Sequence, residues 1–428
     1  MNFIDFNLKP RLLQAIQKVG YTEPTHIQQK CFEPIFSGRD IIGKSQTGTG
    51  KTVAFLLPLL QRLEPNNDTE VLVVCPTREL ANQTVEQLRN ILKDSEGVKS
   101  LAIFGGQSIE RQIFALKKGC QFVVGTPGRI MDHLRRKTLK LGNLKTIVLD
   151  EADEMLNMGF KEDIDTILKS CPKEIQTLLF SATMPPEILK ITKEYQKNPE
   201  MIEIAKDETT VSKIKQYYIY NKELSKEKVI LELVKEFKPK LGLIFVNTIV
   251  GSNKLKNCFE KNNIMAYVLN GDMRQSERTK TMQAYKSGKE ALLIATDVAA
   301  RGIDVNDIDY VFNFDLPQKM EYYVHRIGRT ARAGKNGVSI TIVNNTAQMQ
   351  SIMMLEKKLN VKIDKLNSVS VEQSIYENKV SKSKTEYGIK KEKLPKVRSR
   401  DTQNKWGKDK RQTKFKSKNF NVSKSRKK

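Results

Sequence analysis

The sequence of 428 residues lacks the features that mark membrane-spanning, secreted and zinc-binding proteins. Its longest apolar run, residues 53–60, is short and contains Pro58, whereas a membrane span needs roughly 18 apolar residues. No basic stretch followed by an apolar core opens the chain, as a secretory signal would require. The five cysteines lie far apart and only three histidines are present, so neither a disulfide framework nor a structural zinc site is expected. These absences predict a cytoplasmic protein that does not bind membranes.

Charge is distributed unevenly along the chain. Hydrophobic residues make up 39% of the sequence, which is enough for roughly two to four domains with apolar cores. The formal net charge is +25, and residues 379–428 contain 20 Lys and Arg but only 4 Asp and Glu. Because this segment also has few aliphatic residues, burial could not offset the entropy lost on ordering it. We therefore expect a disordered basic tail, assigned to residues 366–428.

Aromatic residues are interleaved with the lysines of this tail, namely Tyr387, Trp406, Phe415 and Phe420. A polycation can neutralise phosphates, and exposed rings can stack on unpaired bases. The tail therefore predicts nucleic acid as a partner. Two alternatives stay open, a tail that only increases solubility and a tail that binds anionic lipid, although few apolar anchors accompany the charge.

Short apolar runs of strand length alternate with helical patterns in both halves of the chain. Such near-continuous runs predict parallel sheets covered by helices on both faces, and hence two doubly wound α/β domains. We assign the first domain to residues 1–205 and the second to residues 206–365, with 204–215 as the linker. The predicted strands are residues 71–75, 122–124, 146–149, 177–180, 243–246, 266–269, 291–295, 311–314 and 339–343.

Polar segments follow these runs directly. In open parallel sheets, ligands bind beyond the carboxyl ends of the strands, so the segments after the runs are the candidate sites. We expect the two halves to face one shared cleft. The segments are residues 76–79, 126–129, 150–151, 181–183, 247–248 and 296–297.

Residues 45–52 form a glycine-rich segment between a short apolar run and a helical pattern. Its backbone N–H groups and the helix N-terminus can surround phosphates, Lys51 can reach the β- and γ-phosphates, and Thr52 can ligate Mg²⁺. Ser45 stands where the strict pattern has glycine. The alternative is a surface turn rich in glycine and threonine.

Asp150 and Glu151 follow a predicted buried strand. Next to a phosphate loop, one carboxylate can hold the metal while the second orients and deprotonates water. A solvated helix start is the alternative.

Three arginines recur at intervals of three residues, at Arg326, Arg329 and Arg332. They would share one face if the segment is helical, and a guanidinium group at a γ-phosphate stabilises the charge that develops during phosphoryl transfer. Otherwise the segment is an ordinary basic helix face.

Taken together, these motifs resemble the DEAD-box family of ATP-dependent RNA helicases over about residues 3–345. Residues 150–153 resemble the sequence that names the family, and residues 20–28 resemble its adenine-reading Q motif, with Phe3 as the upstream aromatic residue. The resemblance implies that Gln28 hydrogen-bonds adenine and that Tyr21 stacks on it. Tyr21 replaces the commoner Phe and Ser45 the commoner Ala, and neither departure threatens activity.

The resemblance also implies two tandem RecA-like domains and a role for each motif residue. The implied nucleotide-binding residues are Phe3, Tyr21, Gln28, Ser45, Gln46, Thr47, Gly48, Thr49, Gly50, Lys51, Thr52, Asp304, Arg329 and Arg332. The implied catalytic residues are Lys51, Asp150, Glu151, His325, Arg329 and Arg332, with Thr52 and Asp150 at the metal. The implied RNA-binding residues are Pro76, Thr77, Arg78, Gly105, Gly106, Thr126, Pro127, Gly128, Arg129, Thr248, Gln275, Arg278 and Thr296. Asp153, Ser181 and Thr183 would couple hydrolysis to strand separation.

The sequence thus predicts a helicase that uses ATP and Mg²⁺ to bind RNA and unwind short duplexes, largely independently of RNA sequence. An ATP-switched RNA clamp without unwinding is the alternative, and a DNA-directed helicase and a metabolic phosphate-loop enzyme fit less well. We expect a monomer. A resemblance to bacterial members suggests ribosome assembly or mRNA decay, although such a tail also fits a nuclear protein.

Overall fold

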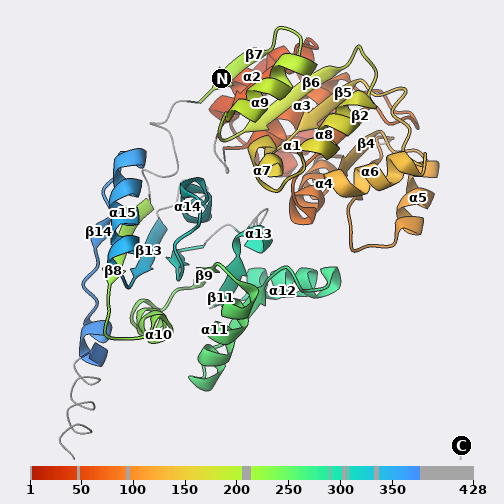
Figure 1. Cartoon of the computed structure of the whole chain (residues 1–428). Coiled ribbons are helices and arrows are strands. Elements are labelled where there is room, and N and C mark those ends of the chain that lie inside the picture. Colours follow the sequence, from red (N-terminus) through yellow and green to blue (C-terminus); the bar gives the residue numbers. More distant parts are fainter. Residues whose placement is uncertain are drawn as a thin grey trace, which may run out of the picture. The chain divides into compact units, whose positions relative to one another are not determined.

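The computed structural model describes residues 2–45, 49–92, 97–204, 214–288, 291–300, 305, 308–331 and 337–375 (Figure 1). The predicted site residues Gln46, Thr47, Gly48, Asp304 and Arg332 lie outside this part of the chain, as does the predicted basic tail beyond residue 375. Within the described part, no helix combines the length and the apolar character that a membrane span requires.

The first domain is built on a seven-stranded sheet in which every strand pair is parallel. Its strands, in spatial order, are β3 (Ser100–Ile103), β4 (Phe122–Gly125), β2 (Val71–Val74), β5 (Thr146–Leu149), β6 (Gln176–Ser181), β1 (Ile41–Lys44) and β7 (Glu200–Glu203). The helices are η1 (Phe3–Phe6), α1 (Pro10–Lys18), α2 (His26–Phe36), α3 (Lys51–Arg62), α4 (Arg78–Leu92), α5 (Ile109–Lys117), α6 (Pro127–Arg135), α7 (Ala152–Asn157), α8 (Lys161–Lys169) and α9 (Pro186–Tyr195).

A second seven-stranded parallel sheet organises the second domain. Its strands, in spatial order, are β10 (Ala266–Leu269), β11 (Ala291–Thr296), β9 (Leu241–Val246), β12 (Tyr310–Asn313), β13 (Gly337–Val343), β8 (Ile214–Tyr220) and β14 (Asp364–Lys365). Its helices are α10 (Lys226–Phe237), α11 (Ile249–Lys261), α12 (Gln275–Ser287), α13 (Asp297–Ala300), α14 (Met320–Ile327) and α15 (Thr346–Leu359).

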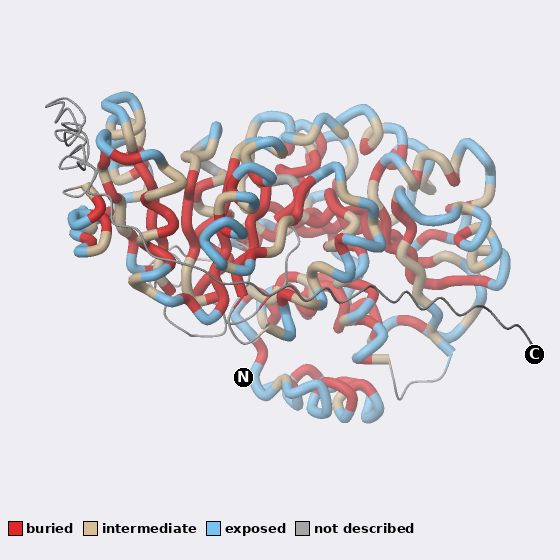
Figure 2. Tube along the Cα trace, turned by 90° about the horizontal axis from the view of Figure 1, so that it is seen from below, coloured by how far each residue is buried: buried red, intermediate tan, exposed pale blue. Residues whose placement is uncertain are grey.

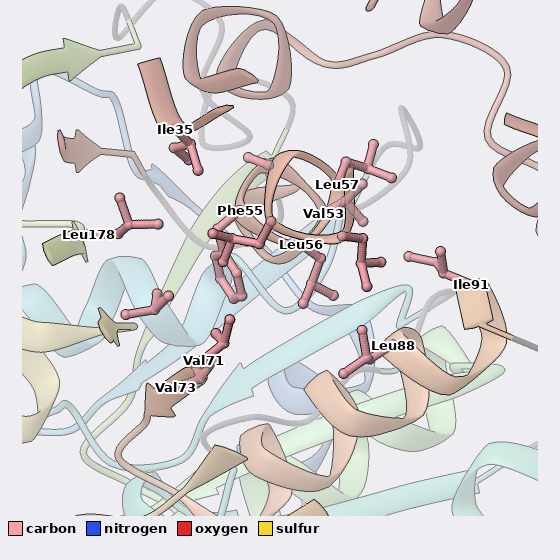
Figure 3. Packing of buried hydrophobic residues seen from close by; sticks show 14 of the residues in the cluster. Ile35, Val53, Phe55, Leu56, Leu57, Val71, Val73, Leu88, Ile91 and Leu178 are labelled. Carbon is pink, nitrogen blue, oxygen red and sulfur yellow. The ribbon is translucent and has the colours of Figure 1, made fainter. Parts of the chain in front are cut away.

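The apolar strands are buried because helices cover both faces of each sheet. Along β2, Val71 and Val73 belong to one core, whereas Leu72 and Val74 belong to the core on the opposite face. Figure 3 shows Phe55 of α3 close to the first pair, and Figure 2 shows the buried segments lying inside a layer of exposed ones. Because alternate residues of the strand are buried on opposite faces of the sheet, the strand is a continuous apolar run in the sequence. The predicted doubly wound α/β fold is confirmed. All five cysteines are free thiols, as expected.

Besides β1, which forms the short apolar run before the glycine-rich segment, four strands fall outside the predicted runs. The edge strands β3 and β7 are only partly buried, and β14 is two residues long, so none has the continuous apolar signal of a central strand. The remaining strand, β8, alternates buried and exposed positions and begins inside the predicted linker, at Ile214.

The second domain extends past residue 365, where the sequence placed its end. Leu366, Val371 and Ile375 pack in the core that contains β9 and α10 residues. The Glu236 carboxylate on α10 accepts hydrogen bonds from Ser368 Oγ at 2.6 Å and from the Ser370 amide at 3.2 Å. Residues 366–375 therefore pack with the second domain, and their assignment to the tail was wrong. Polar residues separate their apolar residues, so no continuous apolar run marks the segment in the sequence.

We predict that a chain ending at residue 365 is less stable than a chain ending at residue 375. Losing the buried Val371 side chain alone should lower the free energy of unfolding by about 1.5–3 kcal/mol. Thermal unfolding of the two truncations measures the difference, and the full chain is the control for removing the tail alone. Equal melting temperatures for the two truncations would contradict the packing described here.

Candidate functional site

The polar segments of the first domain gather at one edge of its sheet. Strands β5, β6 and β1 are neighbours and run in the same direction. Asp150 after β5, Ser181 at the end of β6 and Ser45 after β1 therefore lie at the same edge. Strands β2 and β4 also pair, which brings the segments that begin at Pro76 and Thr126 to the same edge. The topology therefore assembles the predicted sites as expected.

The glycine-rich loop joins β1 to α3. Its last residue, Gly50, has φ of 91°, and a Cβ atom there would lie 2.5 Å from Nε2 of Gln28, so the position requires glycine for conformation and for space. Lys51 is buried at the start of α3, and its Nζ donates to the Ser45 carbonyl at 3.2 Å. The ammonium group is thereby held beneath the loop.

The segment resembling the Q motif supports this loop from α2. Gln28 Nε2 donates to the Gly50 carbonyl at 3.2 Å, while Thr25 Oγ1 donates to the Thr49 carbonyl at 2.9 Å. Gln28 Oε1 also accepts from the Thr25 amide at 2.9 Å, which closes a capping box. Sequence reasoning missed this contact with the loop, and the role of Gln28 toward adenine stays a prediction.

The two predicted aromatic residues differ in burial. Phe3 is buried and meets Phe6 edge-on at 5.9 Å between ring centroids, whereas Tyr21 is half-buried at the rim of the same core. In the described conformation Phe3 therefore serves the core, and its contact with a nucleotide stays a prediction.

Asp150 is a buried carboxyl group at the end of β5. Burial raises its pKa to about 6, the nearby Lys51 charge lowers it, and the neighbouring Glu151 raises it. Glu151 adopts the left-handed conformation with φ of 52°, which is uncommon for a residue with a side chain and places it at the strand-to-helix junction. A buried carboxylate of this kind is stabilised in its charged form by a cation.

Mg²⁺ fits this donor set. It prefers oxygen ligands and is commonly held by one or two carboxylates together with substrate phosphates. Asp150 supplies a buried carboxylate, and Thr52 supplies a hydroxyl in the first turn of α3. No cluster of three or more His, Cys, Asp or Glu side chains that could hold a metal occurs among the described residues.

Asp153 links α7 to the end of β6. Its Oδ2 accepts from the amide and from Oγ1 of Thr183, at 2.9 and 2.8 Å. Ser181 Oγ accepts from the Asp153 amide at 3.3 Å and donates to the Thr183 carbonyl at 2.7 Å. The three predicted coupling residues are thus joined in one network.

The continuous helix assumed for the arginine face ends before Arg329, and Arg332 lies outside the described residues. Helix α14 ends at Ile327, so Arg326 lies in its last turn while Arg329 follows the helix. Arg326 is 2% exposed and makes a two-pronged contact with Asp297 at 2.5 and 2.7 Å. It also donates to Asn247 Oδ1 at 2.8 Å. Arg326 therefore stabilises the second domain instead of facing a phosphate.

His325 and Arg329 adjoin the acidic segment of the first domain. Burial lowers the pKa of His325, the Glu151 and Asp153 charges raise it, and the Arg329 and Lys51 charges lower it. His325 Nδ1 lies 4.0 Å from a carboxylate oxygen of Glu154 on α7. Arg329 Nε donates to the His325 carbonyl at 3.2 Å, which ties the two residues together.

The Arg78 guanidinium group lies beside Gly105 and Gly106, and those of Arg129 and Arg278 are close enough to affect its pKa. Burial lowers the pKa of Arg78, the Glu79 charge raises it, and the Arg278 and Arg129 charges lower it. A Cβ atom on Gly106, whose φ is 83°, would lie 2.3 Å from Nη1 of Arg78. The absence of side chains on these glycines therefore leaves room for the Arg78 guanidinium group.

The remaining residues predicted to bind RNA also have contacts within the protein. Arg278 Nε donates to Glu79 Oε1 at 2.7 Å, and its Nη1 donates to the Asn270 carbonyl at 2.9 Å. Thr248 caps α11 by accepting from the Gly251 amide at 2.9 Å. Gln275 begins α12, Thr296 ends β11, and Thr126, Pro127 and Gly128 begin α6.

Comparisons with known proteins agree with this arrangement. Residues 25–191 match the family model described as DEAD/DEAH box helicase, and residues 225–334 match the helicase conserved C-terminal domain. The chain belongs to the DEAD-box helicase family. It is 45% identical over 342 residues to the ATP-dependent RNA helicase CshA of Listeria monocytogenes, covering 80% of this chain and 66% of that protein. It is 42% identical over 376 residues to the DEAD-box ATP-dependent RNA helicase CshA of Bacillus subtilis, covering 88% and 76%.

Solved structures of the DEAD-box family share the fold. The structure titled S. cerevisiae Dbp5 bound to RNA and ADP BeF3 has a TM-score of 0.78 at 30% identity, covering 88% of this chain and 98% of that chain. Mss116p bound to ssRNA and AMP-PNP has a TM-score of 0.76 at 28% identity, covering 88% and 81%. These matches confirm tandem RecA-like domains.

We predict that Arg326→Ala destabilises the second domain, because the Asp297 carboxylate, which is only 20% exposed, would lose its buried partner. Removing one member of a buried ion pair lowers the free energy of unfolding by about 3–5 kcal/mol. Urea unfolding measures the loss, and Lys256→Ala, which breaks an exposed pair with Glu260, is the control. Similar midpoints for Arg326→Ala and the control would show that the pair is not structural.

Proposed function

We propose that this DEAD-box protein is an ATP-dependent RNA helicase that couples ATP binding and hydrolysis to RNA binding and to local unwinding of short duplexes. The observation that carries the proposal is the joint placement of Lys51, Asp150 and Glu151 in the first domain next to His325 and Arg329 of the second. A nucleotide bound by groups of both domains would make hydrolysis depend on how the domains meet.

On the nucleotide side, each residue has a task that its surroundings support. Lys51 places a fixed positive charge under the loop, where it would meet the phosphates. Mg²⁺, held by Asp150 and Thr52, would neutralise phosphate charge. Glu151 would orient the attacking water and accept its proton, and Arg329 would stabilise charge developing on the phosphoryl oxygens. The roles of Gln46, Thr47, Gly48, Asp304 and Arg332 remain predictions.

On the RNA side, the proposal rests on the arginines near Gly105 and Gly106. Contacts from guanidinium groups and from backbone N–H groups to phosphates position a strand without reading its bases, so binding should be largely independent of sequence. Arg278 of the second domain contacts Glu79 beside Arg78. An RNA strand bound there would touch both domains and favour their association.

Coupling would pass through Asp153. Its carboxylate joins α7, which follows the catalytic pair, to Thr183 at the end of β6. A change in the bound phosphates would therefore move the ends of β5 and β6 together. We further propose that the protein is a cytoplasmic monomer that acts on ribosomal or mRNA-decay assemblies.

We predict that Glu151→Gln abolishes RNA-stimulated ATP hydrolysis while ATP binding persists. Loss of the carboxylate that activates water should slow hydrolysis by about 100-fold or more. Phosphate release measured with and without RNA tests this, with the exposed Glu187→Gln on α9 as the matched control. Full activity in Glu151→Gln or in Lys51→Ala would refute the assignment.

A duplex-displacement assay separates the helicase from the ATP-switched clamp. Strand release that requires ATP supports the helicase. Retention of RNA in the presence of ATP, without strand release, would instead identify a clamp. A clamp could use the same contacts with ATP and RNA.

We predict that Gly106→Ala weakens RNA binding about tenfold, because the new Cβ would displace the Arg78 guanidinium group and strain a backbone with positive φ. ATP binding should not change. Fluorescence anisotropy with a single-stranded RNA measures the affinity. Gly142→Ala, which meets no atom within 4 Å, is the control; equal RNA affinity in the two variants would contradict the role of Arg78.

A further inference from the structure

A buried amide lies between three segments of the first domain. Among the residues of α5, all of which the structure describes, only Gln112 is buried. Its Nε2 donates to the carbonyl of Phe104 at 3.2 Å, immediately before Gly105 and Gly106. Its Oε1 accepts from Arg129 Nη1 at 2.8 Å and lies 3.1 Å from His133 Nε2. A single carboxamide thus joins the glycine pair to both ends of α6.

The chemistry of these groups fixes the direction of each hydrogen bond. An amide oxygen only accepts, so His133 Nε2 must carry the proton that it shares with Gln112. Nδ1 of a neutral ring then accepts from Thr138 Oγ1, which lies 2.8 Å away. Burial lowers the pKa of His133, the Arg129 charge lowers it further, Asp132 raises it and Arg136 lowers it, which favours this neutral ring. His133 is therefore a neutral donor that completes the amide's contacts.

Arg129 is held in place by the same network. Besides Gln112, its Nη1 donates to the Gln107 carbonyl at 3.2 Å, and its Nε lies 3.6 Å from Asp132 Oδ2. Its side chain is 12% exposed, so the guanidinium group is a partly desolvated cation beside the glycine pair. Phosphate binding by such a group depends on orientation, because a guanidinium group binds anions through a planar fork of donors.

We propose that Gln112 and His133 are positioning residues for RNA, which hold Arg129 and the Gly105–Gly106 turn in the arrangement that receives a backbone phosphate. This inference rests on the proposed function. Their hydrogen bonds join Phe104, Arg129 and Thr138, so their loss should weaken RNA binding and leave turnover at saturating RNA almost unchanged.

The test measures RNA-stimulated ATP hydrolysis of the full chain at saturating ATP, with a single-stranded oligouridine as the RNA. Gln112→Leu should raise the half-saturating RNA concentration about tenfold, with kcat within about twofold. His133→Leu should raise it several-fold, whereas His133→Gln, which keeps a donor, should restore it to within about twofold.

Gln121→Leu is the matched control. Like Gln112, Gln121 is a buried amide that donates to a backbone carbonyl, in this case that of Glu64 at 2.8 Å. Unlike Gln112, it precedes β4 and so lies at the opposite edge of the sheet. It should lose stability without changing the half-saturating RNA concentration. In addition, the salt dependence of RNA affinity should become shallower in Gln112→Leu, by about 0.7 in the log–log slope for one lost phosphate contact.

The outcomes separate the two proposals. If the unmodified protein responds to RNA and Gln112→Leu behaves like Gln121→Leu, the positioning role is refuted while the proposed function stands. An equal rise of the half-saturating RNA concentration in His133→Leu and His133→Gln would also refute the positioning role. An unmodified protein whose hydrolysis does not respond to RNA would overturn the proposed function, and this inference with it.

Discussion

Parallel strand direction is the constraint on which every site in this protein depends. Because all strands of a sheet point the same way, each polar segment that follows a strand emerges at the same edge. In the first sheet, β5, β6 and β1 bring the nucleotide segments together, and β3, β4 and β2 bring the arginine-rich segments together. Since β2 pairs with β5, the two groups are neighbours along one edge. The topology thus places the segments proposed to bind phosphate and those proposed to bind RNA side by side before any side chain is considered.

Buried charges then give this edge its properties. Burial favours the uncharged form of the Asp150 carboxyl group, whereas the Lys51 charge favours the charged form. Arg326 is a fully buried cation, and Asp297 and neighbouring amides satisfy it. In both cases the charge is tolerated because its partners are fixed by secondary structure. A rigid arrangement of this kind can respond to a bound anion without first reorganising.

The central strands could be predicted from the sequence, and the prediction failed where three-dimensional context decides. Strand β2 was predictable because both of its faces are buried, whereas β3 and β7 at the edges lack that signal. The spacing of Arg326 and Arg329 indicated a shared face only under the assumption that the helix continues, yet it ends at Ile327. Residues 366–375 carry four apolar side chains, Leu366, Val369, Val371 and Ile375, which are separated by polar residues and form no continuous run.

Contacts between distant segments had no sequence signal. The hydrogen bond from Gln28 to Gly50 joins residues whose motifs were assigned separate tasks. Gln112 and His133 belong to no segment singled out in the sequence, and the role proposed for them follows only from burial and from the contacts of Gln112 with Phe104, Arg129 and His133. Polar residues inside a core are therefore the class that sequence patterns describe least.

The central claim is that the nucleotide and RNA segments on this edge act as one unit. The most direct test is the affinity for single-stranded RNA with and without a non-hydrolysable ATP analogue, measured on the full chain. The account predicts that the analogue tightens RNA binding about tenfold or more, as expected for coupled sites. It also predicts that Thr183→Ala, which removes a hydroxyl bonded to Asp153, reduces this effect. An RNA affinity that does not depend on the analogue would contradict the account.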